Sequence, residues 1–344
     1  MADKILITGG AGFIGCHCAK YFAEKNYDIV IVDNLSRKGT PYNLKWLKEA
    51  FPVAHYNTDV RNFGQVADIF KKEKGFAAVI HLAAQVAVTT SVVNPREDFN
   101  INALGAFNLL ECLRNYCPDT PLIYASTNKV YGYLPNVEVI ESNQRYTFKD
   151  KSGIGESQLL DFHSPYGCSK GCADQYVIDY ARIYGLRTVS FRQSCIYGER
   201  QFGVEDQGWV AWFIIAGVLG MPITIYGDGK QVRDILFISD LIELFDKALN
   251  NKAILTGEAY NIGGGTENTL SLLELIDFLK GEGLNLQFKF EDWRPGDQKV
   301  YISDSSKAWE KLNWRPKVSP STGIRRLMKW VQAHKDLLRQ LLTA

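Results

Sequence analysis

The sequence has few of the residues from which metal sites and disulfide frameworks are built. Its 344 residues include five histidines, scattered with no pair at i, i+4 spacing, and seven cysteines with no paired C-x-x-C spacing. These patterns favour neither a zinc site nor a set of disulfides. We therefore expect no bound metal, and we expect the cysteines to be buried or half-buried free thiols.

Charge of one sign and long hydrophobic runs are also lacking. Lys and Arg number 39 against 38 Asp and Glu, so the formal net charge is +1. Such a balance gives no broad basic field for nucleic acid or for an anionic membrane surface. The apolar run within residues 1–15 is too short for a secretion signal, and no stretch approaches the roughly 20 apolar residues of a membrane span. We expect a cytoplasmic protein that binds neither nucleic acid nor membrane.

What the chain does contain is enough apolar residues for a large core, arranged in alternating strand and helix patterns. Hydrophobic residues make up 46% of the sequence. The alternation predicts an α/β fold with a Rossmann-type, doubly wound parallel sheet and helices on both faces. The expected strands span residues 4–8, 28–32, 77–82, 121–126, 187–191 and 259–262, and the expected helices span residues 13–25, 65–72, 99–116 and 170–184.

The composition changes near residue 200, where tryptophans and a glycine-rich stretch follow the alternating region. We predict a Rossmann domain over residues 1–191, with a return segment at about 235–263, and a smaller C-terminal lobe over residues 192–344. Residues 133–164 are polar and poor in periodicity, and loops of this length in compact domains are commonly functional lids. Their position beside the catalytic motif described below favours a lid.

A glycine motif and an acidic residue predict a dinucleotide site. Gly9, Gly12 and Gly15 form G-x-x-G-x-x-G between the first strand and the first helix, where a backbone without side chains can approach a pyrophosphate. Asp33 ends the second strand, where its carboxylate can accept hydrogen bonds from both ribose hydroxyls of NAD and would repel the 2′-phosphate of NADP. Arg37 could accept that phosphate instead, but we favour NAD.

With these motifs the sequence resembles the extended short-chain dehydrogenase/reductases over nearly its whole length. The resemblance implies that Asp59 and Val60 flank the adenine and that the residues after the fourth strand line the cofactor. Asn102 occupies the position of a structural asparagine. The predicted cofactor-binding residues are Gly9, Gly12, Phe13, Ile14, Gly15, Asp33, Asn34, Ser36, Arg37, Asp59, Val60, Leu82, Ala83, Ala84, Asn102, Tyr166 and Lys170.

Three residues are predicted to be catalytic. Tyr166 and Lys170 form a Y-x-x-x-K pair that places a phenol and an ammonium on one helix face. A phenol with a reference pKa of about 10 is a poor base at neutral pH, but a nearby ammonium and the positive nicotinamide ring favour the phenolate. Tyr166 can then take a proton from a sugar hydroxyl. The resemblance implies that Thr127, in the segment Ser-Thr-Asn-Lys-Val-Tyr-Gly, orients the substrate.

Two residues after Thr127 argue against one reaction of the related enzymes. Nucleotide-sugar 4,6-dehydratases carry an Asp-Glu pair immediately after the catalytic threonine to expel water, and this chain has Asn128 and Lys129 instead. The resemblance therefore argues against dehydration.

The C-terminal lobe is predicted to hold a nucleoside diphosphate. Residues 227–234 and 294–297 resemble the G-x-Q-x-R-D and R-P-x-D segments of the family, whose arginines usually reach the pyrophosphate with their forked donors. For Arg200 and Gln201 a role in stabilising the lobe is equally consistent with the sequence. The predicted substrate-binding residues are Gln85, Thr127, Asn128, Gln193, Ser194, Arg200, Gln201, Arg233 and Arg294.

Longer segments resemble the CDP-paratose 2-epimerases, also called CDP-tyvelose 2-epimerases, at residues 33–39, 126–132, 160–170, 200–202 and 206–209. The resemblance implies epimerisation at carbon 2 of a CDP-hexose by transient oxidation to a 2-keto sugar and re-reduction on the opposite face. The alternatives are a nucleotide-sugar 4-epimerase of the UDP-glucose type and a non-catalytic NAD-sensing protein of the same fold. The family commonly assembles, so we expect a homodimer or a homotetramer.

Overall fold

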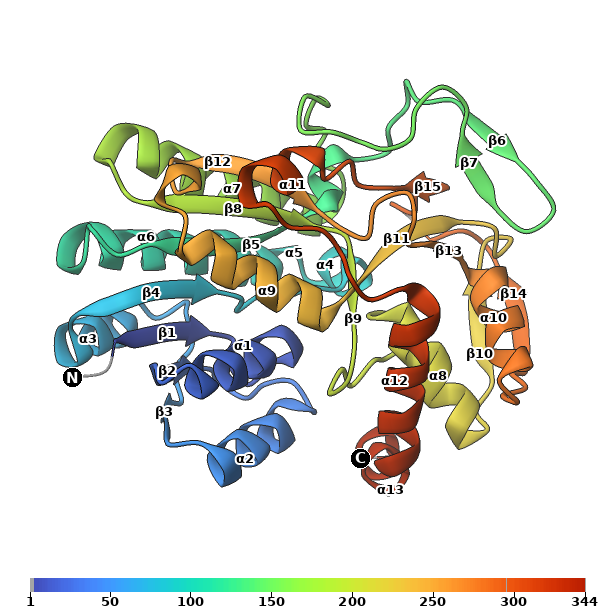
Figure 1. Cartoon of the computed structure of the whole chain (residues 1–344), viewed down its shortest axis with the longest axis horizontal. Coiled ribbons are helices and arrows are strands. Elements are labelled where there is room, and N and C mark those ends of the chain that lie inside the picture. The colour runs from blue at the N-terminus through green and yellow to red at the C-terminus, as the bar shows by residue number, and fades with distance from the viewer. Residues whose placement is uncertain (1–2, 295, 344) are drawn as a thin grey trace.

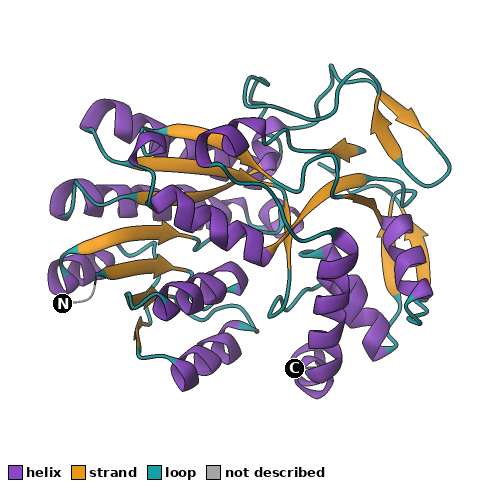
Figure 2. Ribbon diagram, in the orientation of Figure 1, coloured by secondary structure: helices purple, strands orange, loops and turns teal. Residues whose placement is uncertain are grey.

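A seven-stranded parallel sheet forms the centre of the molecule in the computed structural model, which describes residues 3–294 and 296–343. Its strand order is β12-β8-β5-β4-β1-β2-β3, so the direction of winding reverses beside β1 (Figure 1; Figure 2). The predicted doubly wound parallel sheet is confirmed. The strands are β1 (Lys4–Thr8), β2 (Asp28–Val32), β3 (Val53–Tyr56), β4 (Phe76–His81), β5 (Leu122–Thr127), β8 (Thr188–Gln193) and β12 (Glu258–Ile262).

Helices cover both faces of this sheet, so side chains on either face of its central strands are buried. Ile5, Leu6 and Ile7 of β1, for example, are fully buried although their side chains alternate between the two faces. One face carries α1 (Phe13–Glu24), α2 (Thr40–Ala50) and α9 (Ile238–Leu249), and the other carries α3 (Phe63–Glu73), α6 (Gly105–Tyr116) and α7 (Ser164–Tyr184).

The predicted helix over residues 99–116 consists of two pieces. A π-helical turn, η1 (Asn100–Leu104), follows the short α5 (Pro95–Phe99) and leads directly into α6. The backbone stays helical across these residues, but the wider turn changes the direction in which the following side chains point. The remaining short helices are α4 (Val88–Val93), η2 (Asn128–Tyr131) and η3 (Lys252–Ile254).

After β8 the chain builds a group of smaller sheets and helices at the carboxyl end of the main sheet (Figure 1). Within it, β12 returns to the edge of the main sheet as the sequence predicted. The strands of the smaller sheets are β9 (Cys195–Tyr197), β10 (Ile223–Tyr226), β11 (Val232–Phe237), β13 (Thr269–Ser271), β14 (Phe288–Glu291) and β15 (Val300–Tyr301). The helices are α8 (Trp209–Leu219), α10 (Leu272–Gly281), α11 (Ser306–Leu312), α12 (Pro320–Ala333) and α13 (Lys335–Thr343).

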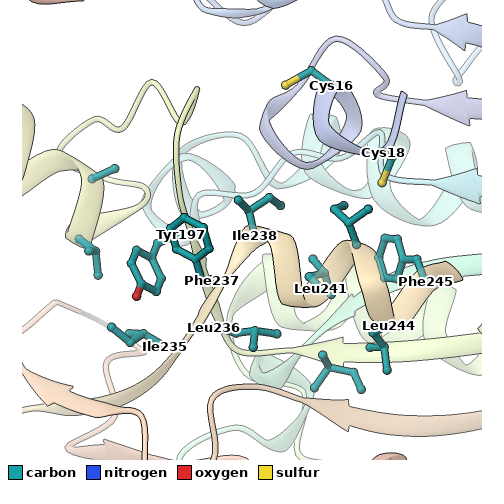
Figure 3. Close-up of a cluster of buried hydrophobic side chains, with 14 of the residues drawn as sticks. Cys16, Cys18, Tyr197, Ile235, Leu236, Phe237, Ile238, Leu241, Leu244 and Phe245 are labelled. Carbon is teal, nitrogen blue, oxygen red and sulfur yellow. The ribbon is translucent and has the colours of Figure 1, made fainter. Parts of the chain in front are cut away.

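The largest hydrophobic cluster joins this C-terminal group to the main sheet. Figure 3 shows α9 and the end of β11 packed beneath α1, with Cys18 directed toward the apolar side chains of α9. The same cluster continues to Ile215 of α8 and Leu327 of α12, both buried. The two parts therefore share one core, and the division at residues 191 and 192 stays a prediction.

The segment over residues 133–164 is not a lid. It forms a hairpin of β6 (Val139–Glu141) and β7 (Tyr146–Phe148) that packs on the C-terminal group, at its outer edge in Figure 1. Tyr146 N donates to Lys230 O at 2.9 Å, and Ile154 pairs with Ser303 as an isolated bridge. None of residues 133–163 lines the two cavities described below. The lid prediction is wrong because the buried side chains of this segment find their apolar partners on β11 and β15.

All seven cysteines are free thiols. Cys168 is exposed on the outer side of α7, so the expectation that every thiol is at least half-buried is wrong for this residue. Within residues 3–294 and 296–343, no group of three His, Cys, Asp or Glu side chains is placed to hold a metal ion. In the same residues, no helix has the length and apolar character needed to cross a membrane.

A buried ion pair fixes α7 to the sheet. The carboxylate of Asp174 and the guanidinium of Arg192 on β8 lie 2.7 Å apart, and their side chains are 0% and 5% exposed. Ser190 Oγ also donates to Asp174 at 2.5 Å. Arg192 extends the network to Tyr131, whose hydroxyl donates to Asn261 Oδ1 on β12 at 2.7 Å. This network of one ion pair and several hydrogen bonds therefore joins α7, η2, β8 and β12.

We predict that Asp174→Ala will lower the free energy of unfolding by about 3–5 kcal/mol, because it leaves a buried guanidinium without its counter-ion. Urea unfolding followed by tryptophan fluorescence measures this change. The control is Asp179→Ala on the same helix, where the pair with Arg182 is 3.5 Å long and more than half exposed. That change should cost less than about 1 kcal/mol. Equal losses in the two variants would contradict the role given to the buried pair.

Candidate active site

Two cavities of about 510 Å³ and 390 Å³ lie at the carboxyl ends of the central strands, where parallel sheets bind ligands. We call them the first and the second cavity. The first follows the glycine turn and the ends of β2 and β4, and the second extends into the C-terminal group. The side chains that line both are Phe13, Ile14, Val86, Ser126, Tyr166, Gln193, Gln201 and Gln207. Tyr166 therefore stands where the two cavities meet.

The glycine turn at one end of the first cavity has no space for side chains. Gly9 has a φ of 68°, and a Cβ there would lie 2.7 Å from Ala83 N in the loop after β4. A Cβ on Gly15 would lie 2.2 Å from Gly9 O, so α1 packs directly on the turn. Gly12 caps α1, and the helix therefore begins at the cavity wall with its positive end.

Asp33 lies at the end of β2 beside this turn and is 8% exposed. Its carboxylate accepts hydrogen bonds from Ala11 N at 3.0 Å and from Leu35 N at 2.8 Å. Burial raises the pKa of the Asp33 carboxyl, and the two backbone hydrogen bonds oppose that rise. Beyond it, Arg37 donates to the side-chain oxygen of Gln207 across the first cavity.

Every predicted cofactor-binding residue except Asn102 lines the first cavity. Asn102 is 1% exposed and accepts from Gln85 N at 2.9 Å while donating to Ser169 Oγ at 3.0 Å. The side chain of Gln85 donates to Asp98 Oδ1 at 2.7 Å, and Gln85 lines neither cavity. Both side chains thus hold the loop after β4 against α7. For Asn102 this agrees with a structural asparagine, and for Gln85 it places the side chain outside the second cavity, where a sugar contact was expected.

Tyr166 is in the first turn of α7 and is 8% exposed. Its backbone N–H donates to Ser91 Oγ at 3.1 Å, which fixes where the helix begins. Burial raises the pKa of the Tyr166 phenol to about 12, a hydrogen bond with the side chain of Thr127 lowers it, and the charge of Asp98 raises it. Thr127 also accepts from Lys129 N at 3.3 Å and so caps η2.

Lys170 follows one turn later and is 4% exposed. Its ammonium donates to Ala125 O at 2.5 Å and lies 4.3 Å from the centre of the Tyr124 ring. Burial lowers the pKa of Lys170 to about 7, while the carboxylates of Asp174 and Asp98 oppose this shift. The ammonium therefore loses its proton near neutral pH.

Two arginines in the second cavity are paired with carboxylates. Arg233 lies 3.0 Å from Asp297, and Arg294 lies 3.0 Å from Asp206. The Arg294 guanidinium also stacks 3.7 Å above the centre of the Tyr226 ring. An anionic ligand in this cavity would compete with these carboxylates for the arginines. Pro295 of the R-P-x-D segment lies outside the described residues.

The other predicted substrate-binding residues fall into two groups. Arg200 lines only the first cavity and not the second. Its guanidinium stacks 3.5 Å from the centre of the Trp46 ring and lies 3.4 Å from Asn43 Oδ1. This placement argues against a sugar contact and favours the structural alternative. The residues that line the second cavity are Thr127, Asn128, Gln193, Ser194, Gln201, Arg233 and Arg294.

Buried polar atoms without partners mark the junction of the cavities. Within the described part of the chain, Ser126 Oγ, Gln193 Nε2 and Gln201 Oε1 are buried and make no hydrogen bond. Leaving such atoms unpaired costs free energy, so ligands that bond to them would be favoured.

The sequence analysis missed several lining residues. Lys129 lines the second cavity, and its place directly after Thr127 and Asn128 was the available signal. Leu338 and Leu342 of α13 line the first cavity. No local pattern could have shown this, because α13 reaches the first cavity from the far end of the chain and packs on α8 and α12.

Comparisons with known proteins agree with this geometry. A family model described as GDP-mannose 4,6 dehydratase matches residues 6–327. CDP-paratose 2-epimerase of Salmonella typhi is 46% identical over 338 residues, which cover 96% of this chain and 99% of that protein. The chain belongs to the extended short-chain dehydrogenase/reductase family.

Solved structures of this short-chain dehydrogenase/reductase fold superpose closely. UDP-glucuronic acid 4-epimerase from Bacillus cereus, in complex with UDP-glucuronic acid and NAD, has a TM-score of 0.82 at 28% identity. UDP-glucose 4-epimerase from Thermus thermophilus, in complex with NAD, has a TM-score of 0.79 at 30% identity. Each comparison covers 96% of this chain and 99% of the other.

We predict that Lys170→Met will stabilise the cofactor-free protein at neutral pH. The folded chain releases the Lys170 proton above about pH 7, whereas an unperturbed lysine holds it to 10.5. The unfolded state therefore binds more protons between these values, and the buried charge opposes folding most at and below pH 7. The gain in melting temperature should be largest there and shrink as the pH rises toward 10. The exposed Lys149→Met is the control, and a loss of stability in Lys170→Met would contradict this balance.

Proposed function

We propose that this chain epimerises carbon 2 of a CDP-hexose of the CDP-paratose or CDP-tyvelose type. At the coarser level the chain is an NAD-dependent nucleotide-sugar epimerase, and therefore an isomerase, like its relatives. The observation that supports the proposal most is the position of Tyr166, with Thr127 beside it, at the junction of the two cavities. A base at that junction can reach a substrate in one cavity while a redox cofactor lies in the other.

The residues of the first cavity fit NAD. The pyrophosphate would lie at the bare glycine turn, and Asp33 would bind the adenosine ribose. Lys170 and Tyr166 line the opposite part of this cavity, where the reactive ring belongs. Since Arg37 is bonded to Gln207 and Asp33 is anionic, this site favours NAD over NADP. When bound, NAD supplies the chemistry of accepting a hydride and giving it back.

The residues of the second cavity fit a nucleoside diphosphate sugar. Thr127 and Asn128 lie beside the base and would contact the sugar. Arg233 and Arg294 would exchange their carboxylate partners for the pyrophosphate, which suits their forked donors. The nucleoside would then extend toward Tyr226, which borders the same cavity.

In the proposed mechanism Tyr166 takes the proton of the carbon-2 hydroxyl, and Thr127 holds that hydroxyl in place. The product of this oxidation is a bound 2-keto sugar. With its phosphates held, the ketosugar turns about its bonds to the anomeric oxygen and phosphorus until its other face is presented. Tyr166 then returns the proton to the oxygen on carbon 2. Because the sugar must turn, few strong contacts to it are expected.

Isotopes distinguish this mechanism from deprotonation of carbon 2. We predict that the reaction run in deuterium oxide with CDP-paratose or CDP-tyvelose will give a 2-epimer with no deuterium at carbon 2, because the same hydrogen leaves and returns. Mass spectrometry and NMR of the product measure this. Substantial deuterium at carbon 2 would contradict hydride retention.

The same product analysis, extended to UDP-sugars, tests the site of reaction. Inversion found only at carbon 4 would replace the proposed function with that of a nucleotide-sugar 4-epimerase, which would use the same residues. A protein that never reduces its NAD with any of these sugars would be the non-catalytic alternative.

We predict that Tyr166→Phe will retain the fold and bound NAD but lose about 10²–10⁴-fold in kcat, which is the usual contribution of a general base. Since burial raises the pKa of Tyr166 to about 12 in the absence of ligands, the wild-type rate should increase with pH as more phenolate forms. The variant should lose this increase. The matched control is Tyr176→Phe on the exposed side of α7, which should leave kcat unchanged. Near wild-type turnover in Tyr166→Phe would exclude this residue as the base.

We also propose that the chain forms a homodimer or homotetramer. Helices α6 and α7 expose Tyr116, Tyr176, Ile183 and Tyr184, which are between 39% and 62% accessible. Apolar side chains gathered on neighbouring helices favour pairing with a second copy. Sedimentation velocity measures this assembly, and a monomer at micromolar concentration would contradict it. The cytoplasmic location stays a prediction.

A further inference from the structure

Lys129 is a cation of the second cavity to which the proposed mechanism gives no role. It is the second residue of η2, two positions after Thr127, and it lines the second cavity. Its ammonium donates to Gly296 O at 3.2 Å. Among the described residues it forms no ion pair within 4 Å, unlike the two arginines of this cavity, which are both paired.

The charges around Lys129 leave an excess of positive charge at this part of the wall. Arg233 on β11 and Asp297 in the loop before β15 both act on its ammonium. Asp297 is already paired with Arg233 at 3.0 Å, so one carboxylate faces two cations. Burial and the charge of Arg233 lower the pKa of Lys129 to about 8, while Asp297 and Cys195 oppose this.

The other arginine of the cavity has a balanced environment. Arg294 has Asp206 as its own partner and lies on the ring of Tyr226. The uncompensated charge therefore lies with Lys129 and Arg233, near Thr127 and Tyr166, and not at Tyr226. An anionic group bound in this cavity gains most from the part of the wall adjacent to the catalytic residues.

We propose that Lys129 binds the β-phosphate of the nucleoside diphosphate sugar, the phosphate that carries the sugar. This inference rests on the proposed function of the second cavity. The β-phosphate is the anionic group closest to a sugar held by Thr127, and Lys129 follows Thr127 by only two residues. Among the described cations that line this cavity, Lys129 alone needs no carboxylate displaced before it can bind.

This role suits the turning of the ketosugar. The β-phosphate is the fixed point about which the sugar rotates, so holding it restrains the nucleotide without restraining the sugar ring. A lysine ammonium is a compact charge with three rotatable donors, and it can follow a phosphate that changes its orientation.

The test compares CDP with CMP, which lacks the β-phosphate. In NAD-loaded enzyme, Lys129→Gln should weaken CDP binding by about tenfold or more, the usual value of a charge-assisted hydrogen bond, and leave CMP binding within about twofold. Lys129→Arg should restore most of the CDP affinity. Isothermal titration calorimetry measures all of these without turnover. The control is Lys149→Gln, an exposed lysine outside both cavities.

The pH dependence of CDP binding gives a second measurement. Because free Lys129 loses its proton near pH 8, wild-type affinity for CDP should fall between pH 7.5 and 9.5, and in Lys129→Gln it should stay level. The groups that face this ammonium are Arg233, Asp297 and Cys195. Burial raises the pKa of the Cys195 thiol.

Equal losses for CDP and CMP in Lys129→Gln would overturn the assignment to the β-phosphate, as would unchanged CDP binding in a folded, NAD-loaded variant. Circular dichroism and NAD content establish that state. If wild-type protein binds CDP weakly, the same comparison is made with UDP and UMP. A β-phosphate effect seen only with UDP and UMP would refute cytosine as the nucleobase and leave the role of Lys129 intact. No effect in either pair would overturn the role of Lys129.

Discussion

Two buried carboxylates fix the helix on which the rest of the site depends. Asp174 binds Arg192 of β8 at 2.7 Å, and Asp98 accepts from Ser169 Oγ at 2.5 Å. Asp174 lies on α7 and Asp98 of α5 contacts that helix through Ser169, so Lys170 lies between these two contacts. Burial alone would drive the proton from Lys170, and the two negative charges oppose that loss. The two carboxylates that orient the helix therefore also keep the pKa of Lys170 near neutral pH.

Because α7 is fixed, Tyr166 can serve two ligands from one position. The tyrosine sits where both cavities end, and the loop before α8 closes the same junction from the other side. Gln207 of that loop receives the side chain of Arg37, which comes from the turn after β2. The first cavity is therefore bounded by residues that also border the second cavity. A change at this junction acts on both ligands at once.

The sequence predicted those parts of the fold and site that depend on local pattern. The bare glycine turn and the Tyr166–Lys170 pair act through neighbours a few residues away, so their spacing alone is informative. Side-chain direction is harder to predict, since the Gln85 side chain donates to Asp98 of α5 and lines neither cavity. The hairpin over residues 133–164 was misjudged for a related reason. Its apolar partner Tyr301 lies far along the chain, and no local pattern could reveal it.

The hairpin of β6 and β7 has a structural role that is separate from the two cavities. It ties the region after β5 to the strands of the C-terminal group, yet it contributes no side chain to either cavity. Its outer surface, such as Ile140 with 49% of its area accessible, faces solvent. Because this hairpin lies apart from both cavities, substitutions on its outer surface are expected to alter stability and to leave ligand binding unchanged.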